Sequence, residues 1–310
     1  MRIPLLTFFL DFLHGNRLII FNSREIVRTL SVRIGERTPR QYDNLQKSRQ
    51  YIASKFIEYG TKPIEETYHH EGKEYANILV EIPGKRRGCD EVLIVGAHYD
   101  TVEGSCGAND NATGIAALLE IYRILSRHRY KRTIRFVAFT LEEPPHFNSE
   151  SMGSIIHSTR CAKRKDRISM MISLDMLGFA GLFVKQEYPS EDMRNRYPAT
   201  GDFLAVASLP SHAQYAFTFK KIFNKHGGGS ARIHDFVAPA SVQGINSSDH
   251  MSFHKFGIPS ILVSDTGHYR NKNYHTENDT ENTVNYWFLS ANILQLSQTI
   301  RDLANRKKIP

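Results

Sequence analysis

Three strongly apolar segments of this chain each end in residues of the kinds that bind metal ions. The run VLIVGA leads into His98, TIRFVAFT leads towards Glu142 and Glu143, and MMISLDML carries Asp175. Apolar runs of this length predict buried strands, and the helical patterns between them predict a sheet covered by helices on both faces. Since α/β sheets bind ligands at the carboxyl ends of their strands, these residues predict a single shared site.

Two loops add residues of the same kinds. The stretch GSCGANDNATG brings Asp110 close to the start of a predicted helix, and YHTENDT supplies His275. Zinc accepts imidazole nitrogen and carboxylate oxygen. Two zinc ions about 3.5–4 Å apart can share a carboxylate and a water whose pKa is lowered towards neutrality. The five candidate ligands, with Glu142 as a spare acid, therefore predict a two-zinc hydrolase.

Each of these pieces also has a purely structural explanation. A His-x-Asp pair at a strand end is more often a hydrogen-bonded surface pair, and adjacent glutamates are common at helix starts, where they interact favourably with the helix dipole. Asp175 is harder to explain in this way, because it lies among Ile172, Leu174 and Met176, where an unpaired carboxylate is costly to bury. The conjunction of the segments favours the metal-binding interpretation.

The sequence resembles the M28 family of zinc aminopeptidases in six successive motifs, over most of its length. These motifs are GAHYDT, GANDNATG, FVAFTLEE, SLDMLG, SSDHMSFHKFGIPSILVSD and YHTENDT. The resemblance implies a three-layer α/β fold of the zinc aminopeptidase, phosphorylase/hydrolase-like kind. Its central sheet would be mixed and mainly parallel, with helices on both sides.

The resemblance implies a ligand set for two zinc ions. His98 and Asp175 would hold one zinc ion, and Glu143 and His275 the other. Asp110 would bridge the two ions. The peptide bond between Asp110 and the next residue is expected to be cis, as it often is in the family.

Three further residues take catalytic or supporting roles by the same resemblance. Glu142 occupies the general-base position, and Tyr274 resembles a tyrosine whose hydroxyl steadies the oxyanion. Asp100 would fix the tautomer of His98, as the partners of metal-bound histidines usually do. For Asp249 and His250, a role at a helix start and in fixing a loop is favoured over ligation.

The function implied is a metal-dependent hydrolase that cleaves N-terminal residues from peptides with a free N-terminus, through a zinc-bridged water and Glu142 as general base. One alternative is a glutaminyl cyclase-like aminoacyltransferase with one zinc ion, although such cyclases lack the DNATG continuation seen at residues 110–114. Another is a catalytically silent, receptor-like protein. The complete ligand set favours the enzyme. The preferred N-terminal residue stays open.

The pattern along the chain indicates one M28-like domain over residues 26–310, after an N-terminal extension of undefined role at residues 1–25. Helices are expected at residues 42–59, 112–126, 153–159, 212–226 and 284–305, and strands at 75–82, 91–97, 133–140, 170–175 and 260–264. The GKRRG turn would join the first two strands as a pair. Residues 186–204 would form an excursion over the rim of the site, and the insertion at residues 144–147 would line the substrate cleft.

Charge and the N-terminal composition limit the partners. The net charge is +8, but the basic residues gather at separate predicted turns and termini, which is typical of solvated surface and not of nucleic-acid binding. The apolar run at the N-terminus is interrupted by Asp11 and is too short to span a bilayer. We therefore expect no integral membrane segment. The lack of a convincing signal peptide favours a cytoplasmic protein, with an exported protein as the alternative.

Overall fold

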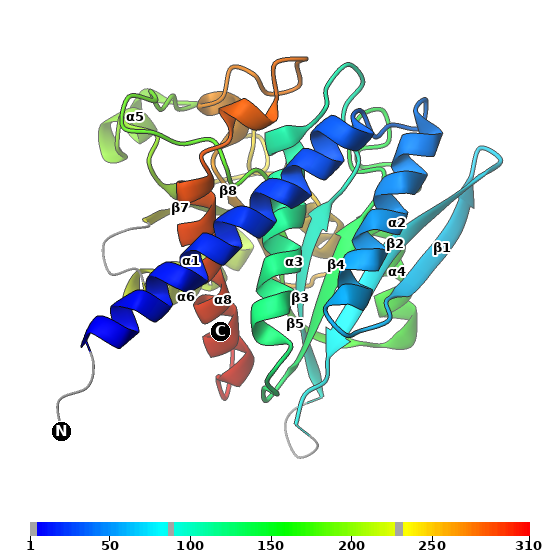
Figure 1. Cartoon of the computed structure of the whole chain (residues 1–310), viewed down its shortest axis with the longest axis horizontal. Coiled ribbons are helices and arrows are strands. Elements are labelled where there is room, and N and C mark those ends of the chain that lie inside the picture. Colours follow the sequence, from blue (N-terminus) through cyan, green and yellow to red (C-terminus); the bar gives the residue numbers. More distant parts are fainter. Residues whose placement is uncertain (1–4, 86–89, 227–231) are drawn as a thin grey trace.

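The centre of the molecule is one eight-stranded mixed sheet (Figure 1). The computed structural model describes residues 5–85, 90–226 and 232–310. The strand order is β1-β2-β4-β3-β5-β8-β6-β7. The strands are β1 (Ile64–His70), β2 (Lys73–Ile82), β3 (Glu91–His98), β4 (Thr133–Phe139), β5 (Arg167–Leu174), β6 (Leu204–Ser208), β7 (Ile233–Val237) and β8 (Ser260–Ser264). The four central strands β4, β3, β5 and β8 are parallel, so their carboxyl ends meet at one edge.

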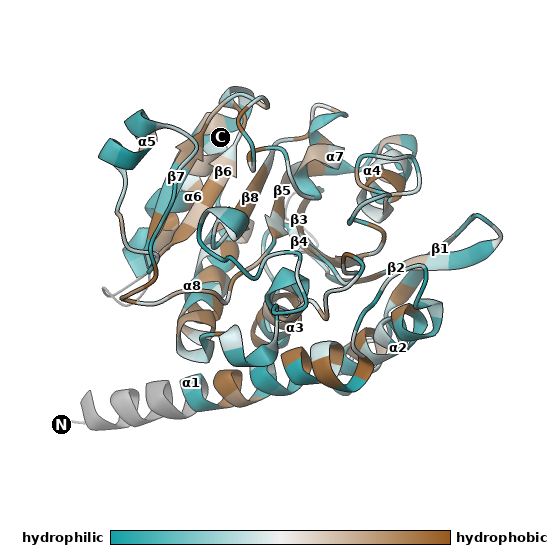
Figure 2. Cartoon of the chain, turned by 90° about the horizontal axis from the view of Figure 1, so that it is seen from above, coloured by the Kyte–Doolittle hydropathy of each residue, from teal (hydrophilic) through white to brown (hydrophobic). Residues whose placement is uncertain are grey.

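Helices cover both faces of the sheet (Figures 1 and 2). They are α1 (Leu5–Arg28), α2 (Tyr42–Glu58), α3 (Gly114–Leu125), α4 (Gly153–Arg164), α5 (Glu191–Arg196), α6 (Ala213–His226), α7 (His250–His254) and α8 (Tyr286–Asn305). On one face α2, α3, α6 and α8 bury their apolar sides, and α1 crosses α3 and α8 as an outer helix. On the other face lie α4 and α7. The expected three-layer α/β fold is confirmed.

The central strands are apolar on both sides because both sides are covered. In β3, Leu93 and Val95 belong to the core beneath α3, whereas Val92 and Ile94 belong to the core beneath α7. This alternation follows from the two-residue period of a strand. It explains why the sequence shows continuous apolar runs where a half-exposed sheet would show alternation.

The N-terminal segment is helical across the expected domain boundary. Helix α1 runs without interruption through residues 25 and 26. Ile19, before that point, and Ile26, after it, are both buried in the main core. Within the described ranges, no helix combines the length and the apolar composition needed to cross a membrane.

The expected pairing of residues 75–82 with residues 91–97 is wrong. Strand β2 instead pairs antiparallel with β1, through a tight turn at Glu71 and Gly72 with φ of 47° and 74°, and β4 lies between β2 and β3. β3 is a central strand with a parallel neighbour on each side, and parallel neighbours require crossover connections that a short turn cannot supply. Residues 86–89 of the GKRRG turn lie outside the described residues.

The other expected helices and strands are present within a few residues of their predicted ends, except that α4 continues to Arg164. The strands β1, β6 and β7 and the helices α1, α5 and α7 were not expected. β6 and β7 are only five residues long, and β1 is an edge strand with mainly polar residues. Such segments form strands here because their neighbours complete the sheet, which a local pattern does not reveal.

Candidate metal centre

The candidate ligands meet at the carboxyl edge of the parallel strands. His98 is the last residue of β3, Glu143 follows β4, and Asp175 directly follows β5. Asp110 lies in the turn Ala108–Thr113, which leads into α3, and His275 lies in the loop before α8. The side chain of His275 is 27% exposed, and the other four candidate ligands are buried. The sequence therefore identified five residues that the fold does bring together.

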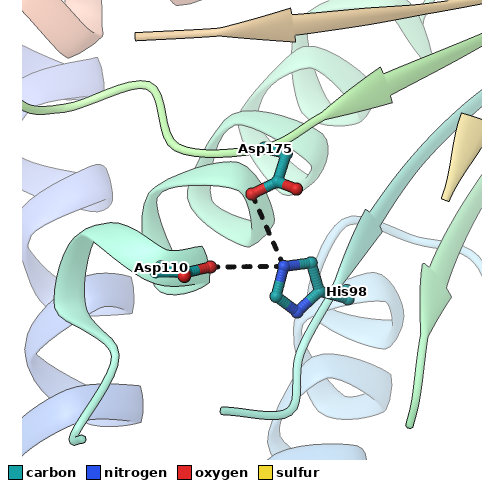
Figure 3. Close-up of side chains that lie close together, drawn as sticks. All are labelled: His98, Asp110 and Asp175. Carbon is teal, nitrogen blue, oxygen red and sulfur yellow. Dashed lines mark ion pairs between the residues drawn. The ribbon is translucent and has the colours of Figure 1, made fainter. Parts of the chain in front are cut away.

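Asp110 lies between the two histidines. Its Oδ1 atom is 3.4 Å from Nε2 of His98, and its Oδ2 atom is 3.2 Å from Nε2 of His275. Asp175 Oδ1 is 3.5 Å from Nε2 of His98, and Glu143 Oε2 is 3.2 Å from Nε2 of His275. Asp110 and Asp175 point toward the same nitrogen of His98 (Figure 3). Among the residues that the structure describes, three groups of potential ligands occur at the site. Two of them share Asp110, and the third consists of His98, Glu142 and Glu143.

Several of these polar atoms are buried without a hydrogen-bond partner in the described part of the chain. They are Oε1 of Glu143, Oδ1 of Asp175 and Nε2 of His275. Buried polar atoms in proteins are nearly always satisfied by hydrogen bonds, ordered water or ions. Nitrogen and carboxylate oxygen are the donor atoms that zinc accepts. The residues therefore fit a metal centre.

The electrostatics of the cluster favour a bound cation. Burial raises the pKa of Glu142 well above its usual range, against the opposing effect of His98. Burial, with the charge of Asp110, also raises the pKa of Glu143 to about 7. Burial would lower the pKa of His275, but Asp110 and Glu143 outweigh it and raise that pKa to about 10. Crowded carboxylates of this kind are stabilised by positive charge, which divalent ions provide.

Asn111, the residue after Asp110, links the turn of Asp110 to the two residues that flank Asp175. Oδ1 of Asn111 accepts the N–H group of Met176 at 3.0 Å, and its Nδ2 group donates to the carbonyl of Leu174 at 2.9 Å. The peptide bond between Asp110 and Asn111 is cis, as the resemblance predicted. Sequence reasoning missed the role of Asn111, although two asparagines flanking a buried aspartate were a usable signal.

The residues expected to support catalysis also lie at the site. Oε2 of Glu142 is 3.8 Å from Nε2 of His98, and the ring of Tyr274 stacks on that of His275 with centroids 3.8 Å apart. Asp100 faces Nδ1 of His98 at 3.7 Å, which is longer than a hydrogen bond. Its other oxygen accepts the N–H group of Glu143 at 3.0 Å. The predicted roles of these three residues stay predictions.

Comparison with known proteins decides the family. The profile described as Peptidase family M28 matches residues 77–299, which is most of the chain. This chain belongs to peptidase family M28. The matched range includes all five candidate ligands, Glu142 and Tyr274.

Relatives of this M28 chain include YfbL, an uncharacterized protein of Escherichia coli K12, which is 33% identical over 269 residues that cover 84% of this chain and 81% of YfbL. Leucine aminopeptidase 2 of Trichophyton rubrum is 22% identical over 75% of this chain. The M28 chain spans about half the length of such fungal relatives, because the match covers 45% of that protein.

Solved structures show the same fold. A zinc aminopeptidase from Bacillus subtilis superposes with a TM-score of 0.72 at 16% identity, covering 94% of this M28 chain and 96% of that one. A glutaminyl cyclase from Porphyromonas gingivalis gives a TM-score of 0.65 at 21% identity, covering 91% and 98%. The fold is therefore shared by an aminopeptidase and a glutaminyl cyclase.

The sequence of this M28 chain favoured Asp249 and His250 as residues that fix the loop before α7. Only His250 does so in the structure. Nε2 of His250 donates to the carbonyl of Ile245 at 2.8 Å. Asp249 stands at the start of α7, yet its side chain caps no backbone N–H group there. Burial raises the pKa of Asp249 to about 7, and neither oxygen has a hydrogen-bond partner among the described residues.

Two cavities open beside the ligands of this M28 chain. The first contains the ligands and is also lined by Pro144 and Phe147 of the insertion, whose role in a substrate cleft stays a prediction. The second is mainly apolar and shares Asp175, Met176, Ser247 and Tyr274 with the first. Its further lining includes Tyr188, Met193, Ala205, Ala207, Phe236 and Leu262. Since Tyr188 and Met193 come from residues 186–204, the expected excursion does lie over the rim.

Proposed function

We propose that this chain is a zinc-dependent aminopeptidase that removes N-terminal residues from peptides. The observation that carries the proposal is the placement of Asp110, whose two oxygens face His98 at 3.4 Å and His275 at 3.2 Å. A carboxylate so placed can serve two metal ions at once. The M28 membership and the aminopeptidases among the relatives support the same activity.

Each zinc ion would have three protein ligands. His98 and Asp175 would hold one ion and Glu143 and His275 the other, with Asp110 shared. Bound zinc would supply a water of lowered pKa and a Lewis acid for the peptide carbonyl. The protein's part is to hold the five side chains in fixed positions, at the ends of packed strands and in loops tied to them.

Glu142 is the candidate general base. It is 4% exposed and lies in the same cavity as the ligands, but it belongs to neither of the two groups that share Asp110. A carboxylate so placed can take a proton from the attacking water and pass it to the leaving amine. Tyr274 lines the same cavity, so its hydroxyl is a candidate donor to the oxyanion.

The second cavity supports a preference for a large apolar N-terminal side chain. It begins at Met176 and Tyr274, beside the ligands, and continues between Phe236 and Leu262. Carboxylates at its mouth would attract the cationic amine of an unblocked peptide. A substrate bound in this way would place its first carbonyl near the ligands and its first side chain in the apolar cavity.

The test compares three substrates under zinc-replete conditions and after chelation. They are leucyl anilide, its N-acetylated form and a peptide that begins with glutamine. We expect hydrolysis of leucyl anilide alone, abolished by the chelator and restored by zinc. Comparable hydrolysis of the acetylated substrate would remove the amine requirement. Pyroglutamate formation without anilide cleavage would identify the chain as a glutaminyl cyclase-like enzyme. A folded chain that binds no zinc would support a catalytically silent, receptor-like protein.

A further inference from the structure

A buried arginine outside the ligand set contacts the segment between His98 and Asp110. Arg37 is 0% exposed and lies in the segment between α1 and α2. Its Nε group donates to the carbonyl of Tyr99 at 2.7 Å. Its terminal nitrogens donate to the carbonyls of Cys106 at 2.7 Å and of Gly107 at 2.9 Å.

These carbonyls belong to the segment that joins two candidate ligands. Tyr99 directly follows His98, and Gly107 precedes Asp110 by three residues. The backbone of Arg37 adds to this contact at Thr101, because its N–H group donates to Oγ1 at 3.0 Å and its carbonyl accepts the N–H group of Thr101 at 3.2 Å. One residue thus holds both ends of residues 99–107.

The guanidinium also connects residues 99–107 to the backbone that follows α1. One terminal nitrogen donates to the carbonyls of Leu30 at 3.1 Å and Gly35 at 3.0 Å. A planar fork with five donors can satisfy several carbonyls in fixed directions, and a lysine ammonium cannot reproduce that geometry. Among the described residues, the hydrogen bonds of the Arg37 side chain go to backbone carbonyls.

The charge of Arg37 stays buried near the acidic cluster. Burial lowers the pKa of Arg37 to about 10, and the charges of Asp100, Asp279 and Asp110 counter part of that effect. The side chain therefore remains a cation at neutral pH. Its carbonyl contacts, and not a carboxylate partner, are what hold it in position.

We propose that Arg37 is a positioning residue for the metal centre, which sets the separation of His98 and Asp110 by holding the segment between them. This inference rests on the proposed function, since it assumes that both residues bind zinc. A purely structural role would make Arg37 important for folding but not for zinc affinity. The two roles can be separated by measuring zinc binding and apoprotein stability on the same variants.

The experiment titrates zinc against a competing chelator for the wild-type chain, R37K and R132K, and follows thermal unfolding of each apoprotein. Arg132 is the matched control. It is also buried and donates to the carbonyls of Leu303 and Arg306, but its partner Glu91 begins β3 at the opposite end of the sheet from His98. Both variants keep the charge and lose the fork of donors.

We expect R37K to raise the zinc dissociation constant about 10- to 100-fold, as loss of a residue that orients metal ligands typically does. R132K should lower apoprotein stability without changing zinc affinity. A zinc dissociation constant for R37K that matches R132K would overturn the inference. If R37K does not fold, T101V replaces it, since that variant loses only the bond to the Arg37 N–H group; unchanged zinc affinity in T101V would then overturn it.

The wild-type titration separates this inference from the proposed function. Failure of the wild-type chain to bind zinc would remove the proposed function itself. The wild-type chain could bind zinc and hydrolyse the anilide normally while R37K shows unchanged zinc affinity. That result would contradict only the positioning role of Arg37.

Discussion

The carboxylate of Asp279 accepts a hydrogen bond of 2.9 Å from the backbone N–H group of Asp110. Its other oxygen accepts the N–H group of Asn109, also at 2.9 Å. Asp279 follows His275 in the same loop, so this contact ties the loop of one candidate ligand to the turn of another. The two ligand loops are therefore linked through a residue outside the candidate ligand set.

Replacing Asp279 by Asn should weaken zinc binding. The amide offers one acceptor where two N–H groups need one each, and an unsatisfied buried N–H group costs about 1–3 kcal/mol. We expect the free energy of unfolding to fall by about that amount, and zinc affinity to fall about 10- to 100-fold. Urea unfolding and chelator competition measure the two effects.

The matched control for D279N is D302N, which removes a carboxylate that pairs with His226 far from the ligands in the sequence. D302N should keep wild-type zinc affinity. A D279N variant that binds zinc as tightly as D302N does would contradict the role of Asp279.

Replacing Glu142 by Gln should reduce kcat and leave zinc binding intact. Glu142 lies in the cavity of the ligands but outside the two groups that share Asp110. Loss of a general base typically lowers the rate ~10²–10⁴-fold. Steady-state kinetics and metal analysis are the measurements. E143Q is the contrasting variant, because it should lose zinc; near-normal activity in E142Q would mean that Glu142 is not the base.

Alanine substitutions at Asp110 and His275 should differ in metal content. Asp110 faces both histidines, whereas His275 faces only one of the two ligand groups. We expect D110A to lose zinc at both sites and H275A mainly at one, as measured by metal analysis after dialysis at limiting zinc. Loss of one equivalent in both variants would argue against a bridging role for Asp110.

Filling the apolar cavity should change the substrate preference. Ala207 on β6 lines that cavity but not the cavity of the ligands. In A207F, the ratio of kcat/KM for leucyl anilide to that for alanyl anilide should fall about tenfold or more, since contacts of this size discriminate by about 1–3 kcal/mol. An unchanged ratio in a folded variant would show that the N-terminal side chain binds elsewhere.

The apoprotein should lose stability in mild acid through His250. Burial lowers the pKa of His250 from 6.5 to about 4. The unfolded chain therefore binds a proton between these values that the folded chain does not, so stability is full above pH 6.5 and decreases as the pH falls towards 4. The loss from this residue reaches at most about 3 kcal/mol.

Urea unfolding at a series of pH values measures this effect. H250Q cannot titrate, so its unfolding free energy should depend less on pH between 6.5 and 4 than that of the wild-type chain. Equal pH dependence in both proteins would show that His250 is not the group responsible.

The sequence by itself predicted the central strands and the residues at their ends. β3, β4 and β5 are continuous apolar runs, and that pattern is local, so it can be recognised without a partner. Parallel strands also place their carboxyl ends together as a rule, which made the gathering of His98, Glu143 and Asp175 predictable. Asp110 and His275 came from the composition of two loops, and the M28 resemblance gave each of them a place in the ligand set.

Only the tertiary structure decided which strands are neighbours and what holds the ligands in place. The insertion of β4 between β2 and β3, and the short strands β6 and β7, depend on packing partners distant in the sequence. Arg37 acts on carbonyls more than sixty residues away, and Asp279 on backbone N–H groups about 170 residues away. Backbone carbonyls and N–H groups are the same in every residue except proline, which lacks the N–H group, so the sequence does not show which side chains they bind.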